Sequence, residues 1–593
     1  MKNLNGVSYS YDQDSNISFL WYDQDYLYDS IEYGRLYHYY SYNYDDADGS
    51  LTSVSINING YPNTINAVLN YAYDGFGRYT SKSIATSGGT HTTSFGYLTN
   101  GSATSSLVSQ YTSTIIKDEI VKYNKTFNYV YDDANMNITE VRDANNNILY
   151  KYTYDELDRL VREDNYELGK TFVYTYDDNG NILCEKIYSY TLDDVSTITP
   201  MHTYEYSYKN ENWKDQLTGY NGGTITYDEV GNPLSYWNGM NFTWENINNL
   251  SNISLNEKNI SYEYNDEGIR TSKTVNGVTH TYVLEGSKIL SEAYGDVLLV
   301  YLYDESDAPI GLLYRESSYA EEVFDEYYFT KNLQGDIIGI YDNTGKIVVE
   351  YSYDAWGELY SYSYYPESEH IAEINPFRYR GYYFDQETGF YYLNSRYYDP
   401  DVKRFISADD IYYLGANGDL QAYNIYAYCS DNPIKYIDAT GNYTRTVSIG
   451  VNATALFGIS FSLGFSYDHH GNMAFSFSYA LPNYDDTMYI GGLDAGVSIS
   501  EQHTVLDNVD ELAGKSMYVG GSGGYMGYFG GDLVALPDNY EGKGIGGSSW
   551  IGAQASVGLG IGADAHIMQT NTVQTKSFNP IKSLVNWVCS WFD

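Results

Sequence analysis

The segment YTYDDNGNI, Tyr174–Ile182, is a clear copy of a unit that recurs along much of the chain. Tyr-x-Tyr places two rings on one face of a strand, because successive side chains alternate between the two faces. The aspartate that follows can accept hydrogen bonds from backbone amides ahead of it and start a turn. Glycine then supplies the positive φ that tight turns need. Each copy therefore predicts the first strand and the turn of a β-hairpin.

The unit recurs at irregular intervals. Asp132, Asp155 and Asp177 are 23 and 22 residues apart, whereas other copies are separated by longer stretches. An alternating apolar strand follows each turn, so successive hairpins predict one long antiparallel sheet that coils or closes to protect its edges. We interpret the tyrosines as strand-packing residues rather than a ligand-binding surface. Other copies are YAYDGFGR (Tyr71–Arg78), YVYDDANMN (Tyr129–Asn137), YTYDELDRL (Tyr152–Leu160), ITYDEVGNPL (Ile225–Leu234), YEYNDEGIR (Tyr262–Arg270), YLYDESD (Tyr301–Asp307) and YSYDAWGEL (Tyr351–Leu359).

The composition agrees with a wall of strands. Tyrosine supplies 73 of 593 residues, with 54 glycines and only 11 prolines. The net charge of −45 repels nucleic acid and anionic lipid, so we expect no nucleic-acid partner and a monomer. Three distant cysteines do not make a disulfide framework. No signal peptide is visible at the first residues, which read as the inside of a repeat, and we expect a fragment of a larger protein or a short family member.

Four segments in the later part of the chain follow one another in a specific order. They are RYRGYY (Arg378–Tyr383), FDQETGFYYLNSRYYDP (Phe384–Pro400), KRFISADD (Lys403–Asp410) and NIYAYCSDNP (Asn424–Pro433). The stretch that contains them resembles the core of RHS-repeat, or YD-repeat, proteins, which include toxin-complex C components and teneurins. The resemblance implies an all-β fold with three parts: a spiral shell of β-hairpins over residues 1–326, a core over 327–442 that closes the shell, and a variable domain over 443–593.

The resemblance also implies self-cleavage by an aspartyl-protease-like pair. Carried over by motif, the pair is Asp409 and Asp438, Arg404 is the arginine that tunes it, and the scissile bond is Asn442–Tyr443. Two close carboxylates share a proton, so one can act as base on water while the other acts as acid.

The sequence departs from the family pattern at two places. The usual ending Asp-Pro-x-Gly-Leu is replaced by DATGN, residues 438–442, and Lys403 stands where glycine is common. Loss of the proline loosens the turn before the predicted cleavage site. The alternative for Asp409 and Asp438 is that they cap turns in the core without catalysis.

Residues 443–593 have a different composition from the rest of the chain. They hold 23 of the 54 glycines and no Tyr-x-Tyr-Asp unit, and their 5 basic and 13 acidic residues disfavour a nuclease. Alternating small and apolar residues predict a curved antiparallel sheet or small barrel. The end, residues 580–593, predicts a short closing helix, and contact with a membrane interface is the alternative. No enzyme signature, cofactor motif or metal motif stands out here.

Two functions are consistent with these patterns. In the first, the shell encloses or presents a variable C-terminal effector of the polymorphic-toxin type, which a bacterium secretes or displays against competing cells. A cognate immunity protein and secretion machinery would then be its partners. In the second, the chain is a non-enzymatic interaction or adhesion protein that is secreted or lies at the cell surface.

Overall fold

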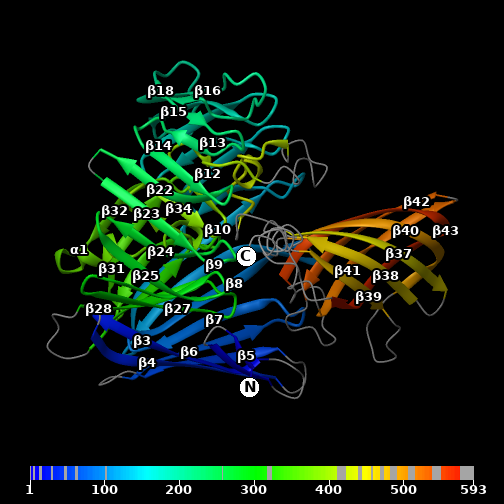
Figure 1. The fold of residues 1–593 in the computed structure, drawn as a ribbon, viewed down its shortest axis with the longest axis horizontal. Coiled ribbons are helices and arrows are strands. Elements are labelled where there is room, and N and C mark those ends of the chain that lie inside the picture. Colours follow the sequence, from blue (N-terminus) through cyan, green and yellow to red (C-terminus); the bar gives the residue numbers. More distant parts are fainter. Residues whose placement is uncertain are drawn as a thin grey trace, which may run out of the picture. The chain divides into compact units, whose positions relative to one another are not determined.

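The computed structural model describes residues 2–4, 7–11, 17–28, 31–45, 50–59, 64–100, 103–256, 258–316, 323–409 and 423–438, together with seven strands in the C-terminal region. These residues are almost entirely β-structure, as the repeats predict (Figure 1). The chain divides into two compact units, one of Met1–Tyr44, Leu51–Asp74 and Tyr79–Asp438, and one of Asp45–Ser50, Gly75–Arg78 and Ala439–Asp593.

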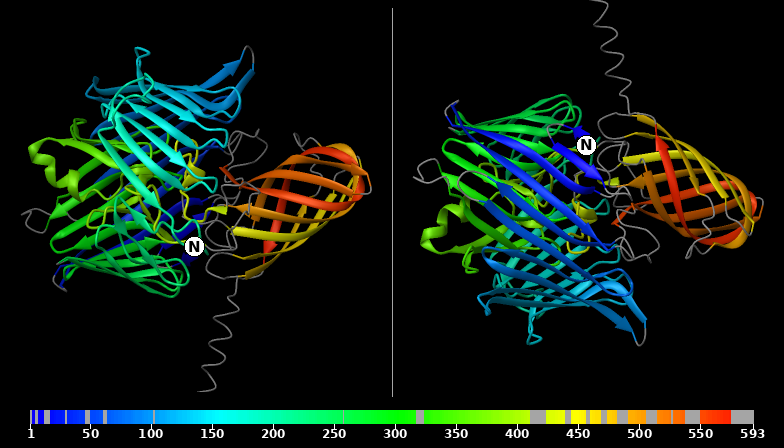
Figure 2. Two further views of the ribbon diagram at one scale, coloured as in Figure 1. Left: turned by 90° about the horizontal axis from the view of Figure 1, so that it is seen from above. Right: turned by 90° about the horizontal axis from the view of Figure 1, so that it is seen from below.

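The first unit contains two large sheets, of 18 and 14 strands, in which strands that are consecutive in the sequence pair antiparallel. Figure 2 shows them as a curved wall of hairpins that passes from blue through cyan to green. We call β1–β32 the shell strands. The strands of the larger sheet are β1 (Lys2–Leu4), β2 (Val7–Tyr11), β3 (Ile17–Tyr28), β4 (Ile31–Tyr44), β5 (Leu51–Asn59), β6 (Thr64–Tyr73), β7 (Tyr79–Thr86), β8 (Gly89–Asn100), β9 (Ala103–Lys117), β10 (Ile120–Tyr131), β11 (Ile138–Arg142), β12 (Ile148–Tyr154), β13 (Leu160–Asn165), β14 (Lys170–Tyr176), β15 (Ile182–Ser189), β16 (His202–Ser207), β17 (Gly219–Tyr220) and β18 (Gly223–Thr224).

The smaller of the two sheets continues the same pattern. Its strands are β19 (Thr226–Tyr227), β20 (Pro233–Ser235), β21 (Asn241–Glu245), β22 (Asn249–Leu255), β23 (Lys258–Tyr264), β24 (Arg270–Val275), β25 (Val278–Glu285), β26 (Lys288–Tyr294), β27 (Val297–Tyr303), β28 (Pro309–Glu316), β29 (Asp325–Lys331), β30 (Ile337–Asp342), β31 (Ile347–Tyr353) and β32 (Leu359–Tyr364).

In most units the aspartate caps its turn, as predicted. Asp177 Oδ1 accepts hydrogen bonds from the amides of Asn179 (2.8 Å) and Asn181 (2.9 Å). The variant residue Asn265 bonds the amides of Glu267 and Ile269 in the same way. These bonds satisfy amides that the hairpin ladder leaves unpaired at the turn. Equivalent pairs of bonds are made by Asp155, Asp228, Asp304 and Asp354.

The two tyrosines of each unit have different roles. Tyr174, the first, is buried with its ring in the core, and its hydroxyl has no hydrogen-bond partner in the described part of the chain. Tyr176, the second, donates to the carbonyl of Leu160 at 2.6 Å and so ties its hairpin to the preceding strand. The same bond, from the second tyrosine to a carbonyl 10 to 23 residues earlier, is made by Tyr73, Tyr131, Tyr154, Tyr227, Tyr264, Tyr303 and Tyr353.

Because of this difference, replacing tyrosine by phenylalanine should change the free energy of unfolding differently at the two positions. Tyr176→Phe removes a bond between hairpins and leaves the Leu160 carbonyl without that donor, so we expect a loss of about 1 kcal/mol in the free energy of unfolding. Tyr174→Phe removes a hydroxyl that lacks a partner, so we expect no loss or a small gain. Urea unfolding of both variants checks the prediction, and equal losses would contradict it.

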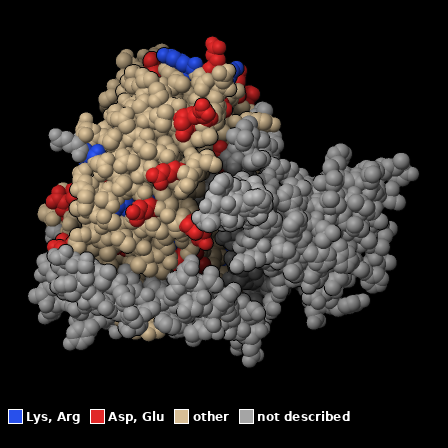
Figure 3. Space-filling view, in the orientation of Figure 1, with Lys and Arg blue, Asp and Glu red and all other residues tan. Residues whose placement is uncertain are grey.

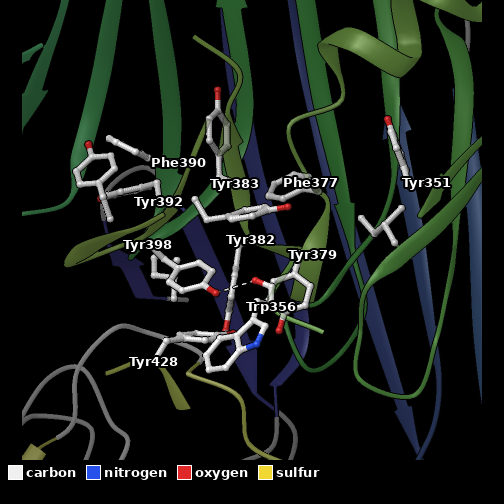
Figure 4. Close-up of a cluster of buried hydrophobic side chains, with 14 of the residues drawn as sticks. Tyr351, Trp356, Phe377, Tyr379, Tyr382, Tyr383, Phe390, Tyr392, Tyr398 and Tyr428 are labelled. Atoms are coloured by element: carbon white, nitrogen blue, oxygen red, sulfur yellow. Dashed lines mark hydrogen bonds between the residues drawn. The ribbon is translucent and has the colours of Figure 1, made fainter. Parts of the chain in front are cut away.

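The core segment, residues 366–438, packs against the shell strands. It contains a four-stranded antiparallel sheet and little helix. Trp356, Tyr379, Tyr398 and Tyr428 belong to the buried aromatic cluster that joins this segment to the shell strands (Figure 4). Its elements are η1 (Pro366–Ser368), α1 (Glu369–Ile374), η2 (Tyr379–Gly381), β33 (Tyr383–Asp385), β34 (Phe390–Leu393), β35 (Arg396–Asp399), β36 (Arg404–Phe405) and η5 (Cys429–Asp431).

The described strands of the C-terminal region form one antiparallel sheet of seven strands, as its alternating residues predict. β39 pairs with β38 and also with β43, so the strand order returns to itself. The predicted closing helix over residues 580–593 lies outside the described residues. The strands are β37 (Thr444–Ala455), β38 (Ile459–Tyr467), β39 (Met473–Ala480), β40 (Ile490–Thr504), β41 (Gly514–Tyr525), β42 (Gly527–Leu536) and β43 (Ser549–Gln574).

Candidate functional site

The structure brings the two predicted aspartates to one arginine. Arg396 Nη2 lies 2.9 Å from Asp409 Oδ2 and 3.6 Å from Asp438 Oδ2. Arg396 begins β35, Asp409 follows β36, and Asp438 ends the core segment, so the site joins three separate stretches of the core. Arg396 is a residue that the motif comparison did not select.

Two contacts hold the guanidinium of Arg396 in place. It stacks on the ring of Phe405 at 3.6 Å from the ring centroid, and its Nη1 donates to the carbonyl of Ile425 at 3.2 Å. The amide of Asp409 donates to the same carbonyl at 2.9 Å. The Ile425 carbonyl therefore fixes both members of the Arg396–Asp409 pair. Because Arg396 is buried, its charge interacts with the carboxylates more strongly than it would in water.

The two carboxylates are both partly exposed. Their side chains are 12% exposed for Asp409 and 24% for Asp438. A shared cation offsets part of the repulsion between two nearby carboxylates, and such a pair can hold one proton between them. The arrangement can therefore supply a base and an acid in one place, which hydrolysis of a peptide bond requires.

Arg404, the arginine predicted by motif, faces other groups. It donates to Tyr208 Oη at 2.6 Å, to the carbonyl of Asp215 at 2.7 Å and to Asn424 Oδ1 at 3.3 Å. These contacts attach β36 to the shell near β16. The predicted scissile bond Asn442–Tyr443 lies outside the described residues.

Lys403 is buried among carboxylates of the shell strands. Its Nζ lies 2.9 Å from Glu185 Oε2, 3.5 Å from Glu358 Oε2 and 3.7 Å from Asp354 Oδ2. A further acid, Glu163, belongs to the same cluster, because burial and the neighbouring Asp354 both raise its pKa. A buried cation costs several kcal/mol unless it is paired, and these acids pair it. The lysine that departs from the family pattern therefore has a structural role, in holding the core to the turn after β31 and to β15.

This cluster predicts that the shell loses stability as the pH rises. Burial raises the pKa of Glu163 to about 8 and that of Glu185 to about 7, although Lys403 acts in the opposite direction. A carboxyl pKa raised from 4.5 contributes stability that is fully present below about pH 4.5 and is lost progressively as the pH rises to 7 or 8. Over that window the folded state keeps a proton that the unfolded chain has lost, which lowers the free energy of unfolding by up to about 1.4 kcal/mol per pH unit for each carboxyl.

Urea unfolding between about pH 5 and pH 8 checks this expectation, with Glu163→Gln as the matched variant because it cannot ionise at that position. We expect the variant to show a shallower decline than the unsubstituted chain. A flat profile for the unsubstituted chain, or equal slopes for both, would contradict it.

Neither a metal site nor a membrane-spanning helix is evident in the described part of the chain. No group of three or more His, Cys, Asp or Glu side chains there is arranged to hold a metal ion. No helix among the described residues is both long and apolar enough to cross a membrane. On the face in Figure 3, acidic side chains are scattered over the described surface and do not gather into one patch.

Comparison with known proteins gives relatives for about half of the chain. A tRNA3(Ser)-specific nuclease WapA of Bacillus spizizenii is 33% identical over 299 residues, which cover 50% of this chain and 12% of that protein. Double-stranded DNA deaminase toxin A of Burkholderia cenocepacia is 25% identical over 344 residues, covering 53% and 22%. The chain thus spans only a small part of these relatives. No family model matches the chain.

A solved structure, of TcdB2-TccC3-Cdc42, has the same fold over 73% of this chain and 23% of its own, with a TM-score of 0.55 and 17% sequence identity. At this identity the likeness concerns the fold alone. The core motifs occur in the family order, and the Tyr-x-Tyr-Asp units form hairpins with capped turns. These features are those of RHS/YD-repeat proteins, and the relatives that match about half of the chain support the same assignment.

Proposed function

We propose that this chain is an RHS carrier whose shell and core present a C-terminal effector and release it by self-cleavage between Asn442 and Tyr443. Residues 1–326 serve as the shell, 327–442 as the closing core and 443–593 as the effector. The closing core in this sense includes the last strands of the shell sheet, β30–β32, together with the core segment. The observation that carries the proposal is the single arginine, Arg396, within 2.9 Å and 3.6 Å of the two carboxylates of Asp409 and Asp438. Two turn-capping aspartates would not need to share a buried cation.

The proposed reaction is hydrolysis. One carboxylate takes a proton from water, whose oxygen attacks the carbonyl carbon of Asn442, while the protonated carboxyl polarises that carbonyl. The C–N bond breaks, and the nitrogen of Tyr443 leaves with a proton from the acid. The products are a carboxylate at Asn442 and an amine at Tyr443, so one water molecule is consumed. Arg396 holds the two carboxylates at one place and stabilises their negative charge.

The names of the relatives support the carrier role. They include the WapA tRNA nucleases, a double-stranded DNA deaminase toxin and the Pseudomonas aeruginosa toxin protein Tse5. Because this chain covers so little of them, their activities do not transfer to residues 443–593, whose net negative charge also disfavours a nuclease. We propose a secreted or surface location, with an immunity protein and secretion machinery as partners.

The test is to purify the full chain and examine it on a denaturing gel with N-terminal sequencing. We expect a second fragment that begins at Tyr443. A folded chain that stays whole would overturn self-cleavage. It would then favour the interaction or adhesion role, in which the core only closes the shell.

A further inference from the structure

One tyrosine hydroxyl joins both ends of the segment that carries Asp438. Tyr382 Oη donates to the backbone carbonyl of Asp438 at 2.6 Å and lies 3.1 Å from Tyr428 Oη. Tyr382 and Tyr428 are both buried in the aromatic cluster of Figure 4. The stretch from Tyr428 to Asp438 is therefore a loop whose two ends meet at this hydroxyl.

The loop needs such external contacts because its backbone starts in an unfavourable conformation. Cys429, Ser430 and Asp431 have φ values of 51°, 50° and 59°, in the left-handed region that costs roughly 1 kcal/mol or more for each residue other than glycine. Such a conformation persists only where surrounding structure holds it. Arg380 adds a second contact of this kind, since its Nη2 donates to the carbonyl of Pro433 within the same loop.

Asp438 depends on this support more than Asp409 does. Asp409 is fixed by its own amide on Ile425 and by the closer contact to Arg396. The carboxylate of Asp438 is farther from Arg396 and twice as exposed, at 24% against 12%. The position of the backbone at residue 438 therefore helps to set the position of this carboxylate, and Tyr382 donates a hydrogen bond to that backbone.

We propose that Tyr382 is a positioning residue for self-cleavage, which sets the Asp438 carboxylate against Arg396 and Asp409. The proposal rests on the proposed function and gives a role to the RYRGYY motif that contains Tyr382 and Arg380. The proposed role belongs to the hydroxyl, which bonds Asp438. The ring only packs against the rings of Tyr379 and Tyr391, at 6.2 Å between centroids, and phenylalanine would keep that packing. Burial raises the pKa of Tyr382 well above its ordinary value, so the hydroxyl stays protonated and can donate.

The test compares Tyr382→Phe with Tyr398→Phe in the full chain. Tyr398 belongs to the same cluster, and its hydroxyl donates to the carbonyl of Trp356 at 2.7 Å. Each variant thus loses a bond from a hydroxyl to a carbonyl, and Tyr382→Phe also loses the contact with Tyr428 Oη. Only the Tyr382 bond leads to Asp438. Cleavage is followed by pulse-chase after cell-free synthesis, and folding by the melting temperature.

We expect Tyr382→Phe to slow the appearance of the Tyr443 fragment by about tenfold or more, since a small misplacement of a reacting group has effects of this size. Tyr398→Phe should cleave within about twofold of the unsubstituted rate, with a similar loss of melting temperature. Equal rates in the two variants would overturn the role of Tyr382, and so would failure of Tyr382→Phe alone to fold. An unsubstituted chain that does not cleave would instead overturn the proposed function itself.

Discussion

The chain with Asp409→Asn or Asp438→Asn is expected to stay whole, where the unsubstituted chain splits at Asn442–Tyr443. Asparagine keeps the size of the side chain but can neither take a proton from water nor give one to the leaving nitrogen. Loss of a general acid or base slows such a reaction by about 10²- to 10⁴-fold. Pulse-chase after cell-free synthesis, read on a denaturing gel, measures the rate for each variant.

Asp401→Asn is the matched control for this loss. Asp401 lies in the same core, where its amide donates to Asp399 and its carbonyl accepts a bond from Tyr220, so its substitution should leave cleavage unchanged. Arg396→Gln and Arg404→Gln together test which arginine serves the pair, and the contacts of Arg396 predict the loss there. Cleavage at the unsubstituted rate in Asp409→Asn would contradict the role of the pair.

The largest expected effect on stability follows from Arg270→Ala. Arg270 begins β24 and is fully buried, with Nη1 at 2.5 Å from Asp385 Oδ2 on β33. Its guanidinium lies between 4.2 and 5.9 Å from the ring centroids of Tyr262, Tyr282, Tyr383, Tyr392 and Tyr397. Removing the arginine leaves Asp385 with Lys273 as a buried cation partner and empties the space between the rings. Breaking a buried pair costs about 3–5 kcal/mol, so we expect a loss of this size.

Arg142→Ala provides the comparison. Arg142 pairs with Glu140 on the surface of β11, where both side chains are partly exposed, and such pairs contribute about 1 kcal/mol or less. Urea unfolding of the two variants should therefore separate by several kcal/mol. Similar losses would show that the contact between β24 and β33 does not hold the core to the shell.

The hairpins and their turn caps could be predicted from the sequence because they depend on neighbours in the chain. An aspartate two to four residues before an amide reaches it whatever the rest of the fold does, as Asp177 does with Asn179 and Asn181. The role of Tyr176 was not predicted, since its partner Leu160 belongs to another strand and the register decides which carbonyl it meets. This hydrogen bond explains why the second aromatic position of the repeat is tyrosine and not phenylalanine.

The candidate site was predicted in part. The core motifs identified Asp409 and Asp438, and the structure brings both to one cation. Arg396 was missed because it lies in a strand, 13 residues before Asp409, and only the pairing of β35 with β36 and the return of the chain at Ile425 bring the groups together. One signal could have found it. An arginine inside the aromatic run FYYLNSRYYD is a cation on a strand that must be buried, and it therefore needs carboxylate partners.

The most direct test of the account is the mass of the products made by cell-free synthesis of the full chain in water enriched with heavy oxygen. Self-cleavage by hydrolysis should give two fragments, one that ends at Asn442 and one that begins at Tyr443, with a heavy oxygen atom from water in the new carboxylate of Asn442. A single intact chain that has folded, or fragments whose masses do not include the added water, would contradict it.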